Sequence, residues 1–443
     1  MIANVTLSSE IETHPSIQSA QPSTDWSLVT RIGFRFAFVY FLLYSFPFPF
    51  GFLPHTDYPS EKWSAMWHAI VPWVGRRVLH LSYPVTIFSN GSGDTTYDYV
   101  LALCFLVLSA VAVLLWSILD RKTTAYPRLH WWFRLYVRLV LGSTMINYGA
   151  FKVIQAQFPS PTLTRLIEPY GESSPMGLLW TLMGASKGYN IFAGAAEMLG
   201  GILLFVPQLA MLGALISVGV ISNIFALNMA YDTPVKLYSF HLLIMAVIIA
   251  LPDSRRLANV FLFNRKADPA APPALFKRKQ LRYGILAPQL VFGLYCVFAA
   301  LHQSYGQMKS IEQSMQTPLY GIWSVDEFTI DGQNRPALLT DQDRWQRVIF
   351  QSTQLMWLQL MDGTRHSYPL TLDAAKKTLA IGKSDDKNWK AELAFQRPQP
   401  DELSLEGQFG GHQITAKLRR TDETKFLLKS RGFHWINEHP FNR

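Results

Sequence analysis

Ionisable side chains occur inside stretches of this sequence that are otherwise apolar, and these residues are the first candidates for chemistry. Lys152 follows the run RLVLGSTMINYGAF, and Glu197 lies within FAGAAEMLGGILLF. An ionisable group at the centre of a bilayer costs about 2.5 to 3.5 kcal/mol even on the most lenient insertion scale. Such groups need a partner or water, so we expect both residues to lie in the interior of a helix bundle.

Further polar residues fall at the same expected depth in the neighbouring apolar segments. They are Asn223, Asn228, Lys236 and His241. Asn223 and Asn228 are five residues apart, as are Lys236 and His241, so neither pair shares a helix face. We therefore expect that not all of them point into one cavity.

A polar stripe accompanies Lys152 along its own helix. Arg134, Arg138 and Tyr148 share a face with Lys152, because offsets of 4, 14 and 18 residues from Arg134 lie close to whole helical turns. The stripe should face the bundle interior. Arg134 and Arg138 lie near its inner end, where long side chains can extend to anionic headgroups.

Two interpretations of the intramembrane groups stay open. In the first, Lys152 and Glu197 form a buried pair that fixes helix packing, and the Asn and His side chains supply interhelical hydrogen bonds. In the second, Lys152, Glu197 and His241 line a cavity that opens outward, and they bind an amphipathic molecule or move protons for it. The two interpretations are compatible.

The elements that must position these residues are predicted membrane spans. Charged residues make up 16% of the chain, below the roughly 25% of soluble domains. Several apolar windows approach the ~20 residues that cross a hydrocarbon core. A further segment, 63–81, is interrupted by Pro72, Arg76 and Arg77 and should lie on the surface or cap the bundle. We predict seven spans, at 32–50, 97–119, 131–158, 189–206, 209–230, 235–251 and 283–301.

The distribution of basic residues predicts the orientation. The loop 252–282 is the most basic short loop and should be cytoplasmic, which places the N-terminus inside and everything after Leu301 outside. The net charge of +9 is therefore explained by topology, and we expect the lipid bilayer rather than nucleic acid as a partner. Only Cys104 and Cys296 occur, so no disulfide framework or CxxC motif is available.

From Pro318 onward, short alternating runs separated by turn residues indicate a β domain. An antiparallel up-and-down meander that closes into a small barrel is favoured over a parallel sheet, which would need crossover helices. The start at Gly321, Ile322 and Trp323 resembles the Gly-x-Trp opening of lipocalin-like barrels. In this domain we select Trp323, Arg431, His434 and His439 as candidate binding residues, but we predict no metal site because the histidine spacing matches no structural zinc pattern.

The predicted organisation is an α-helical integral membrane bundle of about seven spanning helices followed by an antiparallel β-barrel. Its parts are a disordered polar tail (1–25), N-terminal spans with an outer loop and an interfacial helix (26–130), a four-helix core (131–251), a basic cytoplasmic loop (252–282), a last span (283–301), a linker (302–317) and an outer-facing β domain (318–443).

The core at 131–251 resembles the DoxX family of small bacterial four-helix membrane proteins. Gly149 and Lys152 match a glycine, two residues, lysine ending, and Glu197, Gly200 and Gly201 match a Glu-x-x-Gly-Gly second helix. The resemblance implies a location in the bacterial inner membrane and a role beside redox chemistry, as an accessory protein or oxidoreductase subunit. It also implies quinone as the cofactor and a periplasmic or membrane redox partner. The extra spans and the β domain depart from the family pattern.

Two further hypotheses remain. The helix that carries Lys152 is also similar to the multi-spanning region of vitamin K-dependent carboxylase-like proteins, which would make Lys152 or His241 a base and the β domain a substrate-docking module. The other hypothesis is a non-catalytic membrane scaffold, in which the Lys152 and Glu197 pair serves packing alone.

Overall fold

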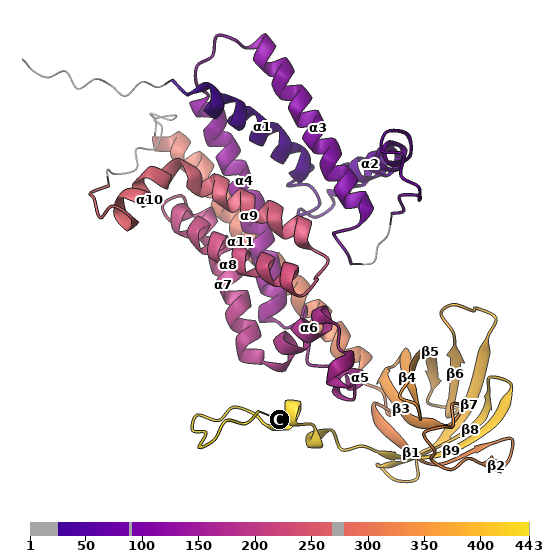
Figure 1. Cartoon of the computed structure of the whole chain (residues 1–443). Coiled ribbons are helices and arrows are strands. Elements are labelled where there is room, and N and C mark those ends of the chain that lie inside the picture. The colour runs from indigo at the N-terminus through magenta and orange to yellow at the C-terminus, as the bar shows by residue number, and fades with distance from the viewer. Residues whose placement is uncertain (1–24, 88–90, 268–278, 443) are drawn as a thin grey trace, which may run out of the picture.

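The structure is a computed structural model that describes residues 25–87, 91–267 and 279–442. It consists of a helical bundle and a β-barrel at one end of that bundle (Figure 1). Nearly all of the expected polar tail and the middle of the basic loop lie outside the described residues.

The helices of the bundle follow the predicted spans within a few residues at most ends. Six helical segments in the described part of the chain are long and apolar enough to cross a membrane, which makes this a multi-pass membrane protein by length and composition: α1, α3, α7, α8, α9 continuing through α10, and α11. The helices are α1 (Leu28–Ser45), α2 (Asp57–Arg77), α3 (Thr96–Leu119), α4 (Pro127–Val153), α5 (Leu163–Leu166), η1 (Tyr170–Glu172), α6 (Pro175–Ala185), α7 (Lys187–Phe205), α8 (Ala210–Ala230), α9 (Lys236–Ala250), η2 (Leu251–Asp253), α10 (Ser254–Phe261) and α11 (Lys279–Ser314).

The predicted third span corresponds to α4, which is not among those six segments although it has 27 residues. It carries Arg134, Arg138 and Lys152, and it lies in the middle of the bundle against α7, α9 and α11. Neighbouring helices therefore cover the polar side chains of α4, as expected for ionisable groups at membrane depth.

One part of the predicted organisation is wrong. The expected linker 302–317 is helical as far as Ser314, because HQSYGQMKSIEQS contains no proline and the helical hydrogen bonds of α11 simply continue. The segment between α4 and α7 contains the short helices α5 and α6. At 11 residues α6 is too short to appear as a span, yet Leu179 and Met183 of this helix are buried.

The β domain is a closed antiparallel barrel, as predicted. Eight strands follow one another in order around it, and β1 pairs with β9 to close the ring. Its interior contains the apolar side chains that alternate along each strand. The strands are β1 (Gly321–Ile330), β3 (Trp345–Ser352), β4 (Leu355–Leu360), β5 (Arg365–Asp373), β6 (Thr378–Gly382), β7 (Lys390–Gln396), β8 (Glu402–Phe409) and β9 (His412–Arg420), with the two-residue β2 (Gln333–Asn334) beside β1.

The barrel contacts the segment between α4 and α7 through α5 (Figure 1). Leu163 packs with Ile322 and Ile349 of the barrel, and its backbone N–H donates to Oε1 of Gln351 at 3.1 Å. The barrel therefore holds the segment that leads into α6. After the barrel come η3 (Glu423–Lys425), α12 (Leu427–Ser430) and an exposed tail.

Candidate functional site

Helices α4 and α7 approach each other closely because glycines face each other along their contact. A Cβ atom added at Gly149 would lie 2.6 Å from the carbonyl oxygen of Gly194, and one added at Gly194 would lie 2.6 Å from the carbonyl oxygen of Gly149. A Cβ at Gly201 would lie 2.7 Å from the carbonyl oxygen of Gly142. Small residues of this kind allow helix backbones in a membrane to come into contact.

This close contact joins Lys152 and Glu197 in a buried ion pair. Nζ of Lys152 lies 2.7 Å from Oε1 and 2.9 Å from Oε2 of Glu197. The two residues are only 7% and 3% exposed. The pairing expected from the sequence is therefore present, and neither charge is left alone in an apolar environment.

The pair forms part of the wall of a cavity of about 530 Å³ between α4, α6, α7, α8 and α9. Most of the wall is apolar, and its polar members include Tyr148, Asn223 and Asn228. A largely apolar pocket of this size with a few convergent polar groups is typical of a small-molecule site. Five of the seven intramembrane candidates from the sequence thus line one cavity.

One side of this cavity is formed by residues that the sequence did not indicate. Leu179, Trp180 and Met183 of α6 line it together with Phe158, whose carbonyl oxygen accepts a hydrogen bond from Nδ2 of Asn190 at 3.0 Å. The sequence feature that indicates α6 is the apolar run PMGLLWTLMGA, which begins directly after Ser174. The hydroxyl oxygen of Ser174 caps this helix by accepting from the backbone N–H of Gly177.

Two polar atoms of cavity residues are buried without any hydrogen-bond partner among the described residues. They are Oε1 of Gln157 and Oγ1 of Thr233. A buried polar group left unsatisfied costs about 1 to 3 kcal/mol. A water molecule or a polar group of a ligand in the cavity would remove that cost.

His241 lies elsewhere, which corrects the expectation that it shares the cavity with Lys152 and Glu197. Its Nδ1 is 2.6 Å from the carbonyl oxygen of Leu237, so Nδ1 carries the proton and donates. Nε2 then accepts from the hydroxyl of Tyr40 at 2.6 Å, and the ring stacks on Tyr44 with centroids 4.0 Å apart. Because α1 covers this face of α9, the histidine binds α1 rather than the cavity.

Lys236 is also outside the cavity wall. Its Nζ is 2.7 Å from Oδ1 of Asp232 and 3.9 Å from Oδ2 of Asp94. Asp94 in addition accepts hydrogen bonds from the backbone N–H groups of Lys236 and Leu237, at 2.7 and 2.8 Å. These contacts provide acceptors for the free backbone N–H groups in the first turn of α9. Lys236 is therefore part of the N-terminal end of that helix and not of the cavity wall.

Arg134 and Arg138 have protein partners at the C-terminal ends of neighbouring helices. Arg134 donates to the carbonyl oxygen of Ile249 and pairs with Asp253, both at 3.0 Å. Arg138 donates twice to the carbonyl oxygen of Leu204, at 3.0 and 2.6 Å. The guanidinium groups thus satisfy C-terminal carbonyls of α9 and α7 instead of extending to headgroups as expected.

The selected residues of the β domain do not form a site. Trp323 is fully buried, and its indole N–H donates to the carbonyl oxygen of Leu319 at 2.8 Å. Arg431, His434 and His439 lie in the exposed tail, where Arg431 binds Oδ1 of Asn437 at 2.7 Å. Within the described ranges, no three His, Cys, Asp or Glu residues are placed to hold a metal ion.

Comparison with known proteins gives one informative relative. Over 124 residues the chain is 34% identical to "Uncharacterized protein YwoB" of Bacillus subtilis (strain 168). The aligned segment makes up 28% of this chain and 79% of the relative. No protein-family model matches the chain, and no solved structure matches it.

Proposed function

The chain belongs to the same family as Bacillus subtilis YwoB, which is described as uncharacterized. We propose a function from the cavity between α4, α6, α7, α8 and α9. The protein is a DoxX-like, quinone-associated protein of the bacterial inner membrane, with α4 as a seventh span. It holds an amphipathic molecule of the quinone class in the cavity beside Lys152 and Glu197, and it serves a redox enzyme as an accessory protein or subunit.

The observation that carries this proposal is the set of polar groups on the cavity wall. Lys152 and Thr233 can donate to a carbonyl oxygen, and Oε1 of Gln157 can only accept, as from a hydroxyl group. A quinone presents carbonyl acceptors and its reduced form presents hydroxyl donors, so both forms find partners here. The apolar remainder of the wall suits the ring and the start of an isoprenoid tail.

The arrangement of the ends supports the proposed topology. The start of α1, the loop before α4 and α10 gather at one end of the bundle, and the barrel lies at the other (Figure 1). The backbone N–H of Trp26 binds the carbonyl oxygen of Thr124 at 3.0 Å, and Arg134 binds Asp253. The basic loops on this end argue for a cytoplasmic side, which leaves a lipocalin-like barrel in the periplasm, where it can meet a redox partner.

The other hypotheses have less support. A carboxylase-like mechanism needs a free base beside the substrate, but Lys152 is paired with Glu197, and His241 is held by Tyr40 and Leu237. A scaffold accounts for the ion pair but gives no reason for the largely apolar cavity beside it.

The test is to extract the lipids that accompany the protein when it is purified from bacterial membranes. Wild type should carry quinone in excess of bulk lipid. Ala196→Phe, which fills the cavity, should lose that excess, whereas Ala195→Phe on the exposed neighbouring position should keep it. Equal quinone content in all three proteins would refute the proposal.

A further inference from the structure

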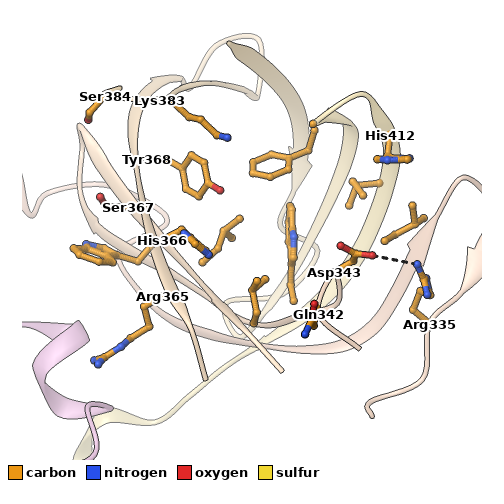
Figure 2. Close-up of a pocket in the computed structure, with 18 of the residues that line it drawn as sticks. Arg335, Gln342, Asp343, Arg365, His366, Ser367, Tyr368, Lys383, Ser384 and His412 are labelled. Carbon is orange, nitrogen blue, oxygen red and sulfur yellow. Dashed lines mark ion pairs between the residues drawn. The ribbon is translucent and has the colours of Figure 1, made fainter. Parts of the chain in front are cut away.

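The barrel contains a second cavity, of about 920 Å³, which opens at one of its ends (Figure 2). Its apolar lining includes Ile330, Leu360 and Phe409, which are partly exposed and lie next to the buried core residues Trp345, Leu358 and Ile414. The rings of Trp345 and Phe409 have centroids 5.1 Å apart and meet edge to face. This cavity is separate from the one between the helices, with which it shares no lining residue.

The strand register explains why polar side chains also reach this cavity. Leu358 of β4, which is buried in the barrel, is directly opposite His366 of β5, and buried Met356 is opposite Tyr368. Directly opposed residues of an antiparallel pair lie on the same face, so His366 and Tyr368 point inward. Lys383 follows buried Ile381 by two residues and also lines the cavity. Figure 2 shows His366, Tyr368 and Lys383 on one side of the interior.

Most of the charges around the opening are already paired. Arg335 binds Asp341 and Asp343 at 3.4 and 3.6 Å, and His412 binds Asp331 at 2.8 Å. The remaining cation is Lys383, for which the described part of the chain provides no ion pair. Its Nζ lies 5.0 Å from the ring centre of Trp389. Asp385, which is exposed, also lines the cavity.

Arg365 lines the cavity edge but is turned toward the bundle. Its Nη2 is 2.7 Å from Glu172 and 3.4 Å from Glu168. Tyr368 supplies a hydroxyl donor, because burial and the nearby carboxylate of Asp385 raise its pKa. The open end of the barrel therefore combines partly exposed apolar side chains with an ammonium group, a phenol and an imidazole.

We propose that the barrel binds an amphipathic carboxylate, with its apolar body against Ile330, Leu360 and Phe409 and its carboxylate at Lys383. The opposite end of the barrel is filled by Trp323 and Leu319, both fully buried. The ligand therefore enters with its apolar part first, and the carboxylate stays at the rim, where a charge remains hydrated.

The test uses the full chain in lipid nanodiscs with a photoreactive fatty acid and its methyl ester as probes, followed by mass spectrometry of the labelled peptides. The acid should label the inner faces of β4, β5 and β8, and the ester should label them at least about tenfold less. Lys383→Met should reduce labelling by the acid to the level of the ester. Lys390→Met should not, because Lys390 lies on the outer face of the neighbouring strand β7.

Equal labelling of the barrel by acid and ester, or barrel labelling unchanged in Lys383→Met, would overturn the proposal, as would labelling confined to the membrane helices. The comparison of acid and ester is made on wild type and so does not depend on how Lys383→Met folds. Because the readout is separated by peptide, a failure here is distinct from a failure of quinone binding between the helices.

Discussion

Gly149 and Gly194 each lie three residues before one member of the Lys152 and Glu197 ion pair, and each occupies the space that a side chain on the other would need. The two glycines bring α4 and α7 into backbone contact. One helical turn further along each chain, the same approach brings Nζ of Lys152 onto the carboxylate of Glu197. The glycine contact therefore positions the polar side of the membrane cavity.

Enlarging Gly149 should separate the two helices. In Gly149→Ala the new methyl group would meet backbone atoms of Gly194 and Met198 at 2.6 and 2.8 Å, so a helix must shift. We expect a loss of about 1 to 3 kcal/mol in the free energy of unfolding, measured by denaturation in detergent. Gly188→Ala is the control, because its Cβ would meet nothing within 4 Å. Equal stability of the two variants would show that the close contact is not required.

Removing one charge of the buried pair should cost more than removing both. Lys152→Met leaves the Glu197 carboxylate buried without a cation, and Glu197→Gln leaves the ammonium group alone. We expect each single variant to lose about 3 to 5 kcal/mol and the double variant to recover a large part of this loss. A double-mutant cycle from thermal unfolding measures the coupling. Additive losses would contradict a direct interaction.

Arg365 should hold the segment 162–172 of the bundle against the barrel. In Arg365→Gln its ion pairs with Glu168 and Glu172 are lost. Hydrogen exchange of the backbone amides in 162–172 should become several-fold faster, while exchange in the barrel strands is unchanged. Arg419→Gln, which removes an exposed pair with Asp326 on the barrel surface, is the matched control. Unaltered exchange in 162–172 would mean that the apolar contact of Leu163 is sufficient.

The proposed topology can be tested with reporter fusions. Alkaline phosphatase fused after Arg443 should be active, because that end lies in the periplasm in the proposed orientation. The same enzyme fused within the basic segment 268–278 should be inactive. The opposite pattern would invert the membrane and place the barrel in the cytoplasm.

The sequence predicts those features that depend on local patterns. Apolar windows locate the spans, and alternation from Pro318 onward predicts the barrel, because both signals follow from which side of an element must be buried. The pairing of Lys152 with Glu197 can also be predicted from the sequence, since two opposite charges at one membrane depth have few other partners.

The features that the sequence did not predict depend on how helices rotate and pack. Lys236 and His241 share the expected depth, but the rotation of α9 directs His241 to Tyr40 and the start of the helix holds Lys236 at Asp94. The contribution of α6 was missed because a helix of 11 residues resembles a loop between spans. The position of Lys383 on the inner side of the barrel depends on the strand register. A weak alternating pattern in the sequence does not define that register.

The most direct test of quinone binding is calorimetric titration of ubiquinone-1 into the protein in nanodiscs, with the heat from empty nanodiscs subtracted. Wild type should show saturable binding at one site. Thr233→Val, which keeps the shape but removes the unsatisfied hydroxyl, should weaken binding, and the double variant Lys152→Met with Glu197→Gln should weaken it at least about tenfold. Heats that do not saturate in wild type, or the same affinity in a folded double variant, would contradict a quinone site at this ion pair.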